Sequence, residues 1–254
     1  MIKYLPIIIL ISVSVCFAQG TAGDKAKYEY RYLIDMPSAG ILQKGFAGVT
    51  TEILPSGVLI VTIEAGVFEN ISFGISYGGS NLIGSGKVDW YKLPAVNFRF
   101  RVLNESVLLP AITLGFDSQG KGLYDDDNKR YRIKSPGFFG AVSKNFEFLG
   151  YLSLHGSVNY SLEKDDGDNF VNLKVGAEKT LGSSFSLIAE YDLGFNDNSN
   201  VYGGEKGYLN LGIRFSPGAG FTAGFDLRDL LSNKTDSKNA ADRSLKIEFL
   251  QSIF

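Results

Sequence analysis

The stretch Asn70-Ile71-Ser72-Phe73-Gly74-Ile75-Ser76-Tyr77-Gly78 contains the clearest fold signal in the chain. Its large apolar side chains occupy every second position, and the positions between them hold only Asn, Ser and Gly. Successive residues of a β-strand point to opposite faces, so the stretch predicts a strand with one apolar and one polar face. A soluble sandwich turns its apolar face inward to a core, whereas a membrane barrel turns it outward to lipid. The pattern by itself leaves both folds open.

The same alternation recurs along the chain, between turns rich in Gly, Asn, Ser and Pro. It predicts strands at about residues 41–53, 57–67, 70–78, 94–103, 107–117, 137–146, 150–162, 170–180, 184–195, 207–216, 220–229 and 243–253. An even number of strands returns the chain to the side on which it began, as single-chain bacterial barrels require. We therefore expect an all-β fold, a single antiparallel transmembrane β-barrel of about 12 strands.

The connections between these strands alternate in length. Tight turns are expected at 69–70, 104–106, 147–150, 182–183 and 217–220, and longer polar loops at 79–93, 118–136, 163–169, 196–206 and 230–242. Short periplasmic turns and long exterior loops produce this rhythm in outer-membrane barrels. The first and last strands should pair and close the barrel, because unpaired backbone groups in hydrocarbon cost several kcal/mol each.

The N-terminal residues resemble a cleaved secretory signal, with Lys3, an apolar run of about eleven residues, and the small Ala18 before Gln19. The run is shorter than the roughly 20 residues that a transmembrane helix needs. We assign 1–18 to a signal peptide, 19–40 to an N-terminal segment in the periplasm or the lumen, and 41–254 to the barrel. Cys16 is the only cysteine, and Val15 before it disfavours lipidation, since a small residue is expected there.

The polar faces of the predicted strands carry six acidic and six basic residues. In a soluble core each of these charges would need a fully desolvated partner, which is unfavourable, whereas a wet lumen tolerates them. Neighbouring strands complement one another in charge, which allows either a structural ion network or a transverse field along a pore. With the one histidine, the predicted lumen-lining residues are Glu64, Arg99, Arg101, His155, Lys174, Glu178, Glu190, Asp192, Arg214, Asp226, Arg228, Lys246 and Glu248.

Two features have a chemical interpretation beside the structural one. His155 shares a polar face with Ser153, Ser157 and Asn159, as a nucleophilic site would require, but that face points inward, away from lipid substrates. The loops 125–128 and 165–169 are rich in Asp and Asn, yet the second lacks the spacing and the closing glutamate of a calcium loop. We therefore expect no catalytic residues, no metal and no cofactor.

The expected partners follow from the two faces and from the charge. The apolar face would contact outer-membrane lipids, and the formal net charge of −2 gives no basic surface for nucleic acid. The final residue, Phe254, resembles the terminal aromatic that barrel-assembly machinery reads. Its position is out of phase with the outward residues of the last strand.

Two stretches resemble a known family. Tyr32-Leu33-Ile34-Asp35-Met36-Pro37-Ser38-Ala39 is similar to the "GLIDMPTA"-type opening of YjbH-like outer-membrane proteins, which are associated with exopolysaccharide production. Leu109 to Gly120, with Ser143-Lys144-Asn145-Phe146, resembles a strand of that family followed by its "SKRF"-like strand. Asn145 departs from the arginine of that pattern. The resemblance implies a link with polysaccharide export and no catalytic residues.

These observations predict a channel or structural protein in the outer membrane of a Gram-negative bacterium, which is not an enzyme. Polysaccharide or small solutes are the expected cargo of such a channel. Two alternatives stay open from the sequence: an outer-membrane enzyme that acts on lipid or glycan, and a secreted β-sandwich that binds a ligand.

Overall fold

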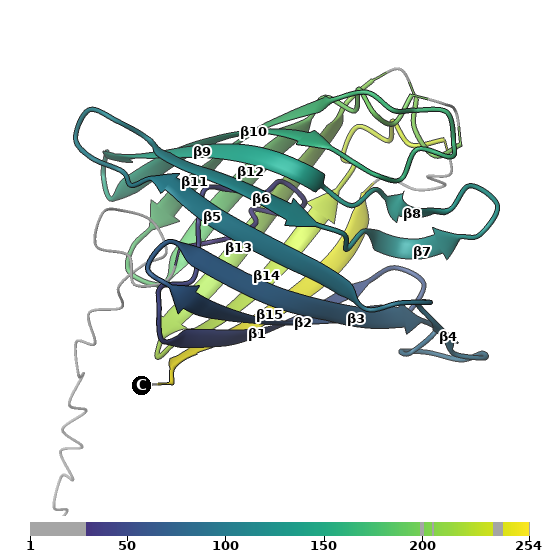
Figure 1. The fold of residues 1–254 in the computed structure, drawn as a ribbon, viewed down its shortest axis with the longest axis horizontal. Coiled ribbons are helices and arrows are strands. Elements are labelled where there is room, and N and C mark those ends of the chain that lie inside the picture. Colours follow the sequence, from purple (N-terminus) through teal and green to yellow (C-terminus); the bar gives the residue numbers. More distant parts are fainter. Residues whose placement is uncertain (1–28, 199–200, 205, 236–240, 254) are drawn as a thin grey trace, which may run out of the picture.

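A ring of antiparallel strands forms the body of the molecule (Figure 1). The computed structural model describes residues 29–198, 201–204, 206–235 and 241–253. The predicted signal peptide and Phe254 lie outside these residues. The strands of the described chain are β1 Phe46–Leu54, β2 Val58–Phe68, β3 Ile71–Ser80, β4 Asp89–Trp90, β5 Ala95–Leu103, β6 Ala111–Asp117, β7 Lys121–Asp125, β8 Arg130–Ile133, β9 Gly137–Glu147, β10 Tyr151–Tyr160, β11 Asn172–Leu181, β12 Phe185–Asp192, β13 Tyr208–Gly218, β14 Phe221–Arg228 and β15 Asp242–Ser252.

Twelve of these strands make a closed wall, which confirms the predicted all-β antiparallel barrel. Their order is β2-β1-β15-β14-β13-β12-β11-β10-β9-β6-β5-β3, and β3 pairs with β2 to complete the ring. The predicted pairing of the first and last strands is present, with Phe46 opposite Ser252 and Ile53 opposite Leu245. Each described wall strand therefore has a partner on both sides, as a barrel surrounded by hydrocarbon requires.

The predicted strand boundaries differ from the observed ones at two places that matter for function. The first strand was expected from residue 41, but Ile41 and Leu42 are buried inside the barrel, before β1 begins. The strand expected from residue 107 begins at Ala111, because Pro110 has no N–H to donate to the ladder. Residues 104–110 therefore form a longer turn than predicted.

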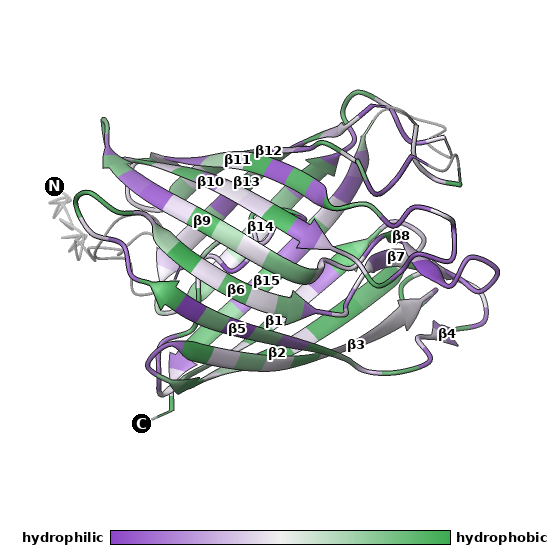
Figure 2. Ribbon diagram, turned by 45° about the horizontal axis from the view of Figure 1, so that its top comes forward, coloured by the Kyte–Doolittle hydropathy of each residue, from purple (hydrophilic) through white to green (hydrophobic). Residues whose placement is uncertain are grey.

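The two faces of the wall differ in the way that the alternation predicts (Figure 2). In β12, Phe185 and Leu187 are exposed on the outside, whereas Ser186, Ile188 and Glu190 are buried on the inside. Figure 2 shows green hydrophobic residues alternating with white or purple ones along the strands. A wall of this kind presents an apolar surface to its surroundings and polar groups to its interior.

The two ends of the barrel also differ. Turns such as 69–70 and 148–150 and the C-terminus lie at one end, called here the short-turn end, and the loops with β4 and β7–β8 lie at the other (Figure 1). At this long-loop end, the hairpin β7–β8 lies within the predicted loop 118–136. No helix in the described part of the chain is long and apolar enough to cross a membrane.

Candidate functional site: a segment inside the lumen

Residues 29–42, called here the lumen segment, lie inside the ring of strands. They are the dark purple start of the described chain in Figure 1. Leu33, Met36 and Ala39 have no exposed surface. A tight loop forms the middle of the segment, since Leu33 N donates to Met36 O at 3.0 Å and Ser38 N donates to Arg31 O at 3.0 Å. Ser38 also bonds to Tyr30 O, and Glu29 accepts Ile41 N within the segment at 3.2 Å. Many further polar contacts join the segment to the barrel.

Arg99, on β5, holds the segment by its carbonyl groups. Its guanidinium donates to Arg31 O at 2.7 Å, to Ser38 O at 3.1 Å and to Gly40 O at 3.2 Å. The same guanidinium lies 4.7 Å from the ring centre of Tyr32. Arg99 is fully buried, so peptide carbonyls and a ring face take the place of water around its charge.

Other basic side chains of the interior hold further carbonyl groups. Arg101 Nη2 donates to Ala39 O at 2.8 Å, and Arg214 Nη2 donates to Leu33 O at 2.8 Å. Lys121, on the hairpin β7–β8, donates to Ile34 O at 2.9 Å, so the long-loop end also reaches the segment. Hydrogen bonds from charged donors are stronger than those between two neutral groups.

Glu190, on β12, holds the amide groups at the tip of the segment. Its carboxylate accepts hydrogen bonds from the backbone N–H groups of Ile34 at 2.9 Å, Asp35 at 3.0 Å and Met36 at 2.9 Å. Asn210 Nδ2 donates to the same carboxylate at 2.9 Å. Three successive N–H groups aimed at one carboxylate form a small anion-binding nest.

Asp35 supplies the segment with a buried negative charge. Its carboxylate lies 2.9 Å from Arg228 Nε and 3.2 Å from Lys121 Nζ. Burial by itself opposes ionisation, but these two cations hold the pKa of the Asp35 carboxyl far below its usual value. Asp35 therefore docks as a carboxylate.

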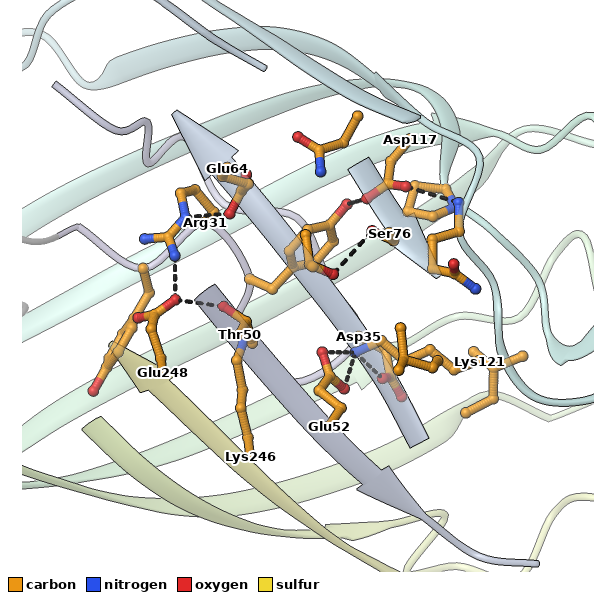
Figure 3. A pocket seen from close by; sticks show the side chains of 18 of the residues that line it. Arg31, Asp35, Thr50, Glu52, Glu64, Ser76, Asp117, Lys121, Lys246 and Glu248 are labelled. Atoms are coloured by element: carbon orange, nitrogen blue, oxygen red, sulfur yellow. Dashed lines mark hydrogen bonds and ion pairs between the residues drawn. The ribbon is translucent and has the colours of Figure 1, made fainter. Parts of the chain in front are cut away.

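Arg31 supplies the matching positive charge. Its Nε donates to Glu64 Oε2 at 2.9 Å, and its Nη2 forms an ion pair with Glu248 (Figure 3). Thr50 donates a further hydrogen bond to Glu248 at 3.0 Å. The segment thus carries charges of both signs, since Glu29 is also acidic and pairs with Arg101, and each charge meets opposite charges of the barrel.

The space beside the segment is small. A cavity of about 50 Å³ lies between it and the wall near Thr50, Glu64 and Lys246. A second of about 30 Å³ adjoins Lys174 toward the long-loop end, and a third of about 30 Å³ adjoins His155. Since one water molecule needs at least about 10–15 Å³ measured in this way, each cavity has room for a few waters at most.

The residues predicted to line the lumen lie on the inner side of the wall in the structure. Those that contact the lumen segment are Glu64, Arg99, Arg101, Lys174, Glu190, Arg214, Arg228 and Glu248. Asp192 and Asp226 form ion pairs within the wall, with Lys174 at 2.8 Å and with Arg214 respectively. Glu178 is buried, and Lys246 lines the cavity beside Thr50.

The sequence reasoning missed the groups of the segment that meet these charges. The sequence predicts charge complementarity between neighbouring strands, and the ion pair between Lys174 and Asp192 joins two such strands. The strand pattern does not identify Arg31 and Asp35 as partners of the charged residues on the inner face of the wall, although both stand among apolar and tyrosine residues. The contrast between these two charged residues and their apolar neighbours is the sequence signal that indicates a binding role.

His155 is bonded to a serine of the neighbouring strand. Its Nδ1 lies 2.8 Å from Ser143 Oγ, and that Oγ accepts the backbone N–H of Ala39 at 3.0 Å. The direction of the hydrogen bond between Ser143 and His155 depends on the histidine tautomer. Ser153 and Asn159, considered with His155 as a nucleophilic site, bond instead to Asn145 and to Pro136 O.

The acidic loops engage cations of the protein itself. Asp166 lies 2.6 Å from Arg130 Nη1 and 2.7 Å from Lys134 Nζ. Asp125 accepts hydrogen bonds from Asp127 and Asn128 and so shapes a turn. Within the described ranges, no three His, Cys, Asp or Glu side chains gather as a metal site.

Comparisons with known proteins bear on the fold. No protein-family model matches the chain, and no curated protein matches it significantly. Among solved structures, a KdgM porin is similar, with a TM-score of 0.50 and 7% identity over 80% of this chain and 98% of that one. A KdgM porin in complex with disordered oligogalacturonate has a TM-score of 0.48, with 8% identity over 80% and 98%. A NanC porin has a TM-score of 0.45, with 10% identity over 81% and 98%.

At so low an identity, the first similarity concerns the fold alone. The chain has the porin-type fold of outer-membrane β-barrels. The resemblance of residues 32–39 and 109–120 to YjbH-like proteins has no counterpart in these comparisons.

Proposed function

We propose that this chain is a channel of a Gram-negative outer membrane and that the lumen segment closes it at rest. The observation that carries the proposal is the chemistry of the contact between segment and wall. The wall holds the segment through charged hydrogen bonds, such as those of Arg99 and Glu190. Water can replace such bonds when the segment leaves, because the charges are then hydrated in a wet lumen. The segment is therefore a plug that can be displaced while the wall stays folded.

The porin fold supports the channel class, since the KdgM neighbour is a porin by name. A lumen with charges of both signs also suits the passage of polar solutes better than that of apolar ones. The small cavities argue that nothing as large as a sugar passes while the segment is docked. Transport would then require its displacement.

The cargo is the narrower part of the proposal. Polysaccharide is the cargo implied by the resemblance of residues 32–39 to YjbH-like proteins, and small solutes are the alternative. In this proposal the outer wall contacts membrane lipids, and the barrel-assembly machinery inserts the chain. A catalytic role for His155 is disfavoured. Ser143 lies at the distance of a nucleophile, but no side chain of the described residues bonds to His155 Nε2 and orients the ring, as the third group of a triad does.

The test is conductance in planar lipid bilayers. Wild type is compared with a variant in which residues 29–42 are replaced by a Gly-Ser linker of the same length. We expect rare, small openings from wild type and conductance several-fold higher from the variant, because the linker lacks the charges and carbonyl geometry that dock the segment. Arg99→Ala/Arg101→Ala in the linker variant should change its ion selectivity, since two lumenal positive charges are lost.

Equal conductance of wild type and linker variant would show that the segment is not the barrier. If neither protein conducts, the chain is a structural protein of the envelope and not a channel. A lipid- or glycan-hydrolysing activity of wild type that is lost in His155→Ala would replace the channel with an enzyme.

A further inference from the structure

The short-turn end carries an unusual group of exposed apolar side chains. They lie in the turns 104–110 and 148–150, which are neighbours because β6 pairs with β9. The tip of the first turn is green in Figure 2, where it projects beyond the strands. We call the group the apolar rim. Its members and their exposed fractions are Val107 93%, Leu108 89%, Leu109 50%, Phe148 59% and Leu149 88%.

Several carbonyl groups of these turns are bonded within the protein. Lys144 Nζ, on the outer face of β9, bonds to Ser106 O and donates to Val107 O at 3.2 Å. Glu105 lies 3.3 Å from the same ammonium and accepts Asn145 N at 2.8 Å. A surface turn in water needs no such arrangement, because water satisfies its carbonyl groups.

In the second turn, 148–150, a lysine on the outer face of the wall also bonds to a backbone carbonyl. Lys179 Nζ, on the outer face of β11, donates to Leu149 O at 2.9 Å and to Thr180 O at 3.0 Å. Phe148 N donates to Gly150 O at 2.8 Å. Leu149 itself has a φ of +46°, a conformation that is costly for a bulky residue, and it aims an almost fully exposed side chain outward.

Two other turns at the same end have polar residues at their tips. The turn 69–70 is Glu-Asn, and the turn 182–184 is Gly-Ser-Ser. The apolar rim therefore belongs to one sector of the barrel, between β5 and β10. It is continuous with the apolar outer wall, where Phe146 and Leu154 are exposed.

We propose that the apolar rim is a membrane anchor, which inserts into the phospholipid leaflet around the short-turn end. Apolar side chains of this size are stabilised when they leave water. Peptide carbonyls in that environment must be satisfied by the protein, which is what Lys144 and Lys179 do. The partner is phospholipid rather than a second protein, because the rim continues the lipid-facing wall. This inference rests on the membrane placement in the proposed function.

The experiment uses single tryptophans as depth reporters. Trp90 is first replaced by Phe, which can keep a ring stacked on Tyr77. Single tryptophans are then introduced by Leu108→Trp in the rim, Val175→Trp on the outer wall as a membrane control, and Ser184→Trp in a polar turn. Each full-length variant is reconstituted into vesicles of phosphatidylethanolamine and phosphatidylglycerol with brominated acyl chains, which quench nearby tryptophan.

We expect Leu108→Trp to lose about half of its emission, as Val175→Trp does, and Ser184→Trp to lose little. If Val175→Trp is quenched but Leu108→Trp behaves like Ser184→Trp, the anchor is refuted and the membrane placement stands. If Val175→Trp is not quenched either, the membrane placement in the proposed function fails, and the anchor fails with it.

Discussion

Adjacent residues of β5 point to opposite faces of the wall, and the two faces have different surroundings. Val96, Phe98 and Phe100 point outward and are 41–42% exposed, whereas Asn97, Arg99 and Arg101 point inward and are at most 5% exposed. In the proposed membrane placement the outward residues need only be apolar, because lipid makes no directional bonds. The inward residues need particular partners at particular distances, because a buried charge without them is very unfavourable. A substitution on the outer face should therefore act through polarity, and one on the inner face through the loss of a specific contact.

The largest effect is expected from a charge on the outer face. Phe98→Arg should lower the free energy of unfolding by about 2–4 kcal/mol if Phe98 lies near the middle of the bilayer. Urea unfolding in lipid vesicles measures it, and Phe98→Leu, which keeps the polarity, should change stability by less than about 1.5 kcal/mol. Equal effects of the two substitutions would mean that this face does not contact hydrocarbon.

The neighbouring residue tests the inner face. Arg99→Met leaves the three carbonyls of the segment without their donor and should weaken docking by about 1–3 kcal/mol. Protease cleavage within residues 29–42 and bilayer conductance should both rise. Arg99→Lys keeps the charge but not the planar fork, so an intermediate value is expected. No change in either measurement would show that Arg99 does not hold the segment.

Glu190→Gln should have a smaller effect of the same kind. The amide oxygen can still accept hydrogen bonds, but without the charge that strengthens them, so docking should weaken by about 1 kcal/mol. Asp192→Asn is the matched control, since Asp192 pairs with Lys174 in the wall. The prediction fails if the two variants raise conductance equally.

The smallest effect is expected from the ionisation of Asp35 between about pH 5 and pH 8. The pKa of Asp35 is lower in the docked segment than its ordinary value, because Arg228 and Lys121 outweigh the effect of burial. Its contribution to docking is therefore present above the ordinary pKa and is lost as the pH falls toward the docked value. Conductance attributable to Asp35 should stay flat in that range and rise only in stronger acid.

Asp35→Asn should be more conductive than wild type at neutral pH, and its conductance should lack the acid-dependent rise. The measurement is single-channel recording at a series of pH values. An acid-dependent rise that Asp35→Asn retains in full would contradict the assignment and would indicate another titrating group.

Part of this comparison could be predicted from residues alone. The parity of Phe98 and Arg99 decides which of them faces outward, once a strand is assigned. The start of β1 could not be predicted, since Ile41 and Leu42 continue an apolar pattern and yet lie inside the barrel. Local pattern does not distinguish an apolar residue that faces lipid from one that is covered by the opposite wall.

The sequence by itself predicted an antiparallel barrel, the approximate positions of its wall strands and the polarity of its faces, because these depend on a period of two residues and on turn chemistry. Only the tertiary structure decided what the inner charges bind. Glu190 receives the amides of Ile34 to Met36, which lie more than 150 positions away in the chain. The reason is physical: a hydrogen bond depends on distance and direction in space, and those are defined only when the ring of strands has closed around the segment.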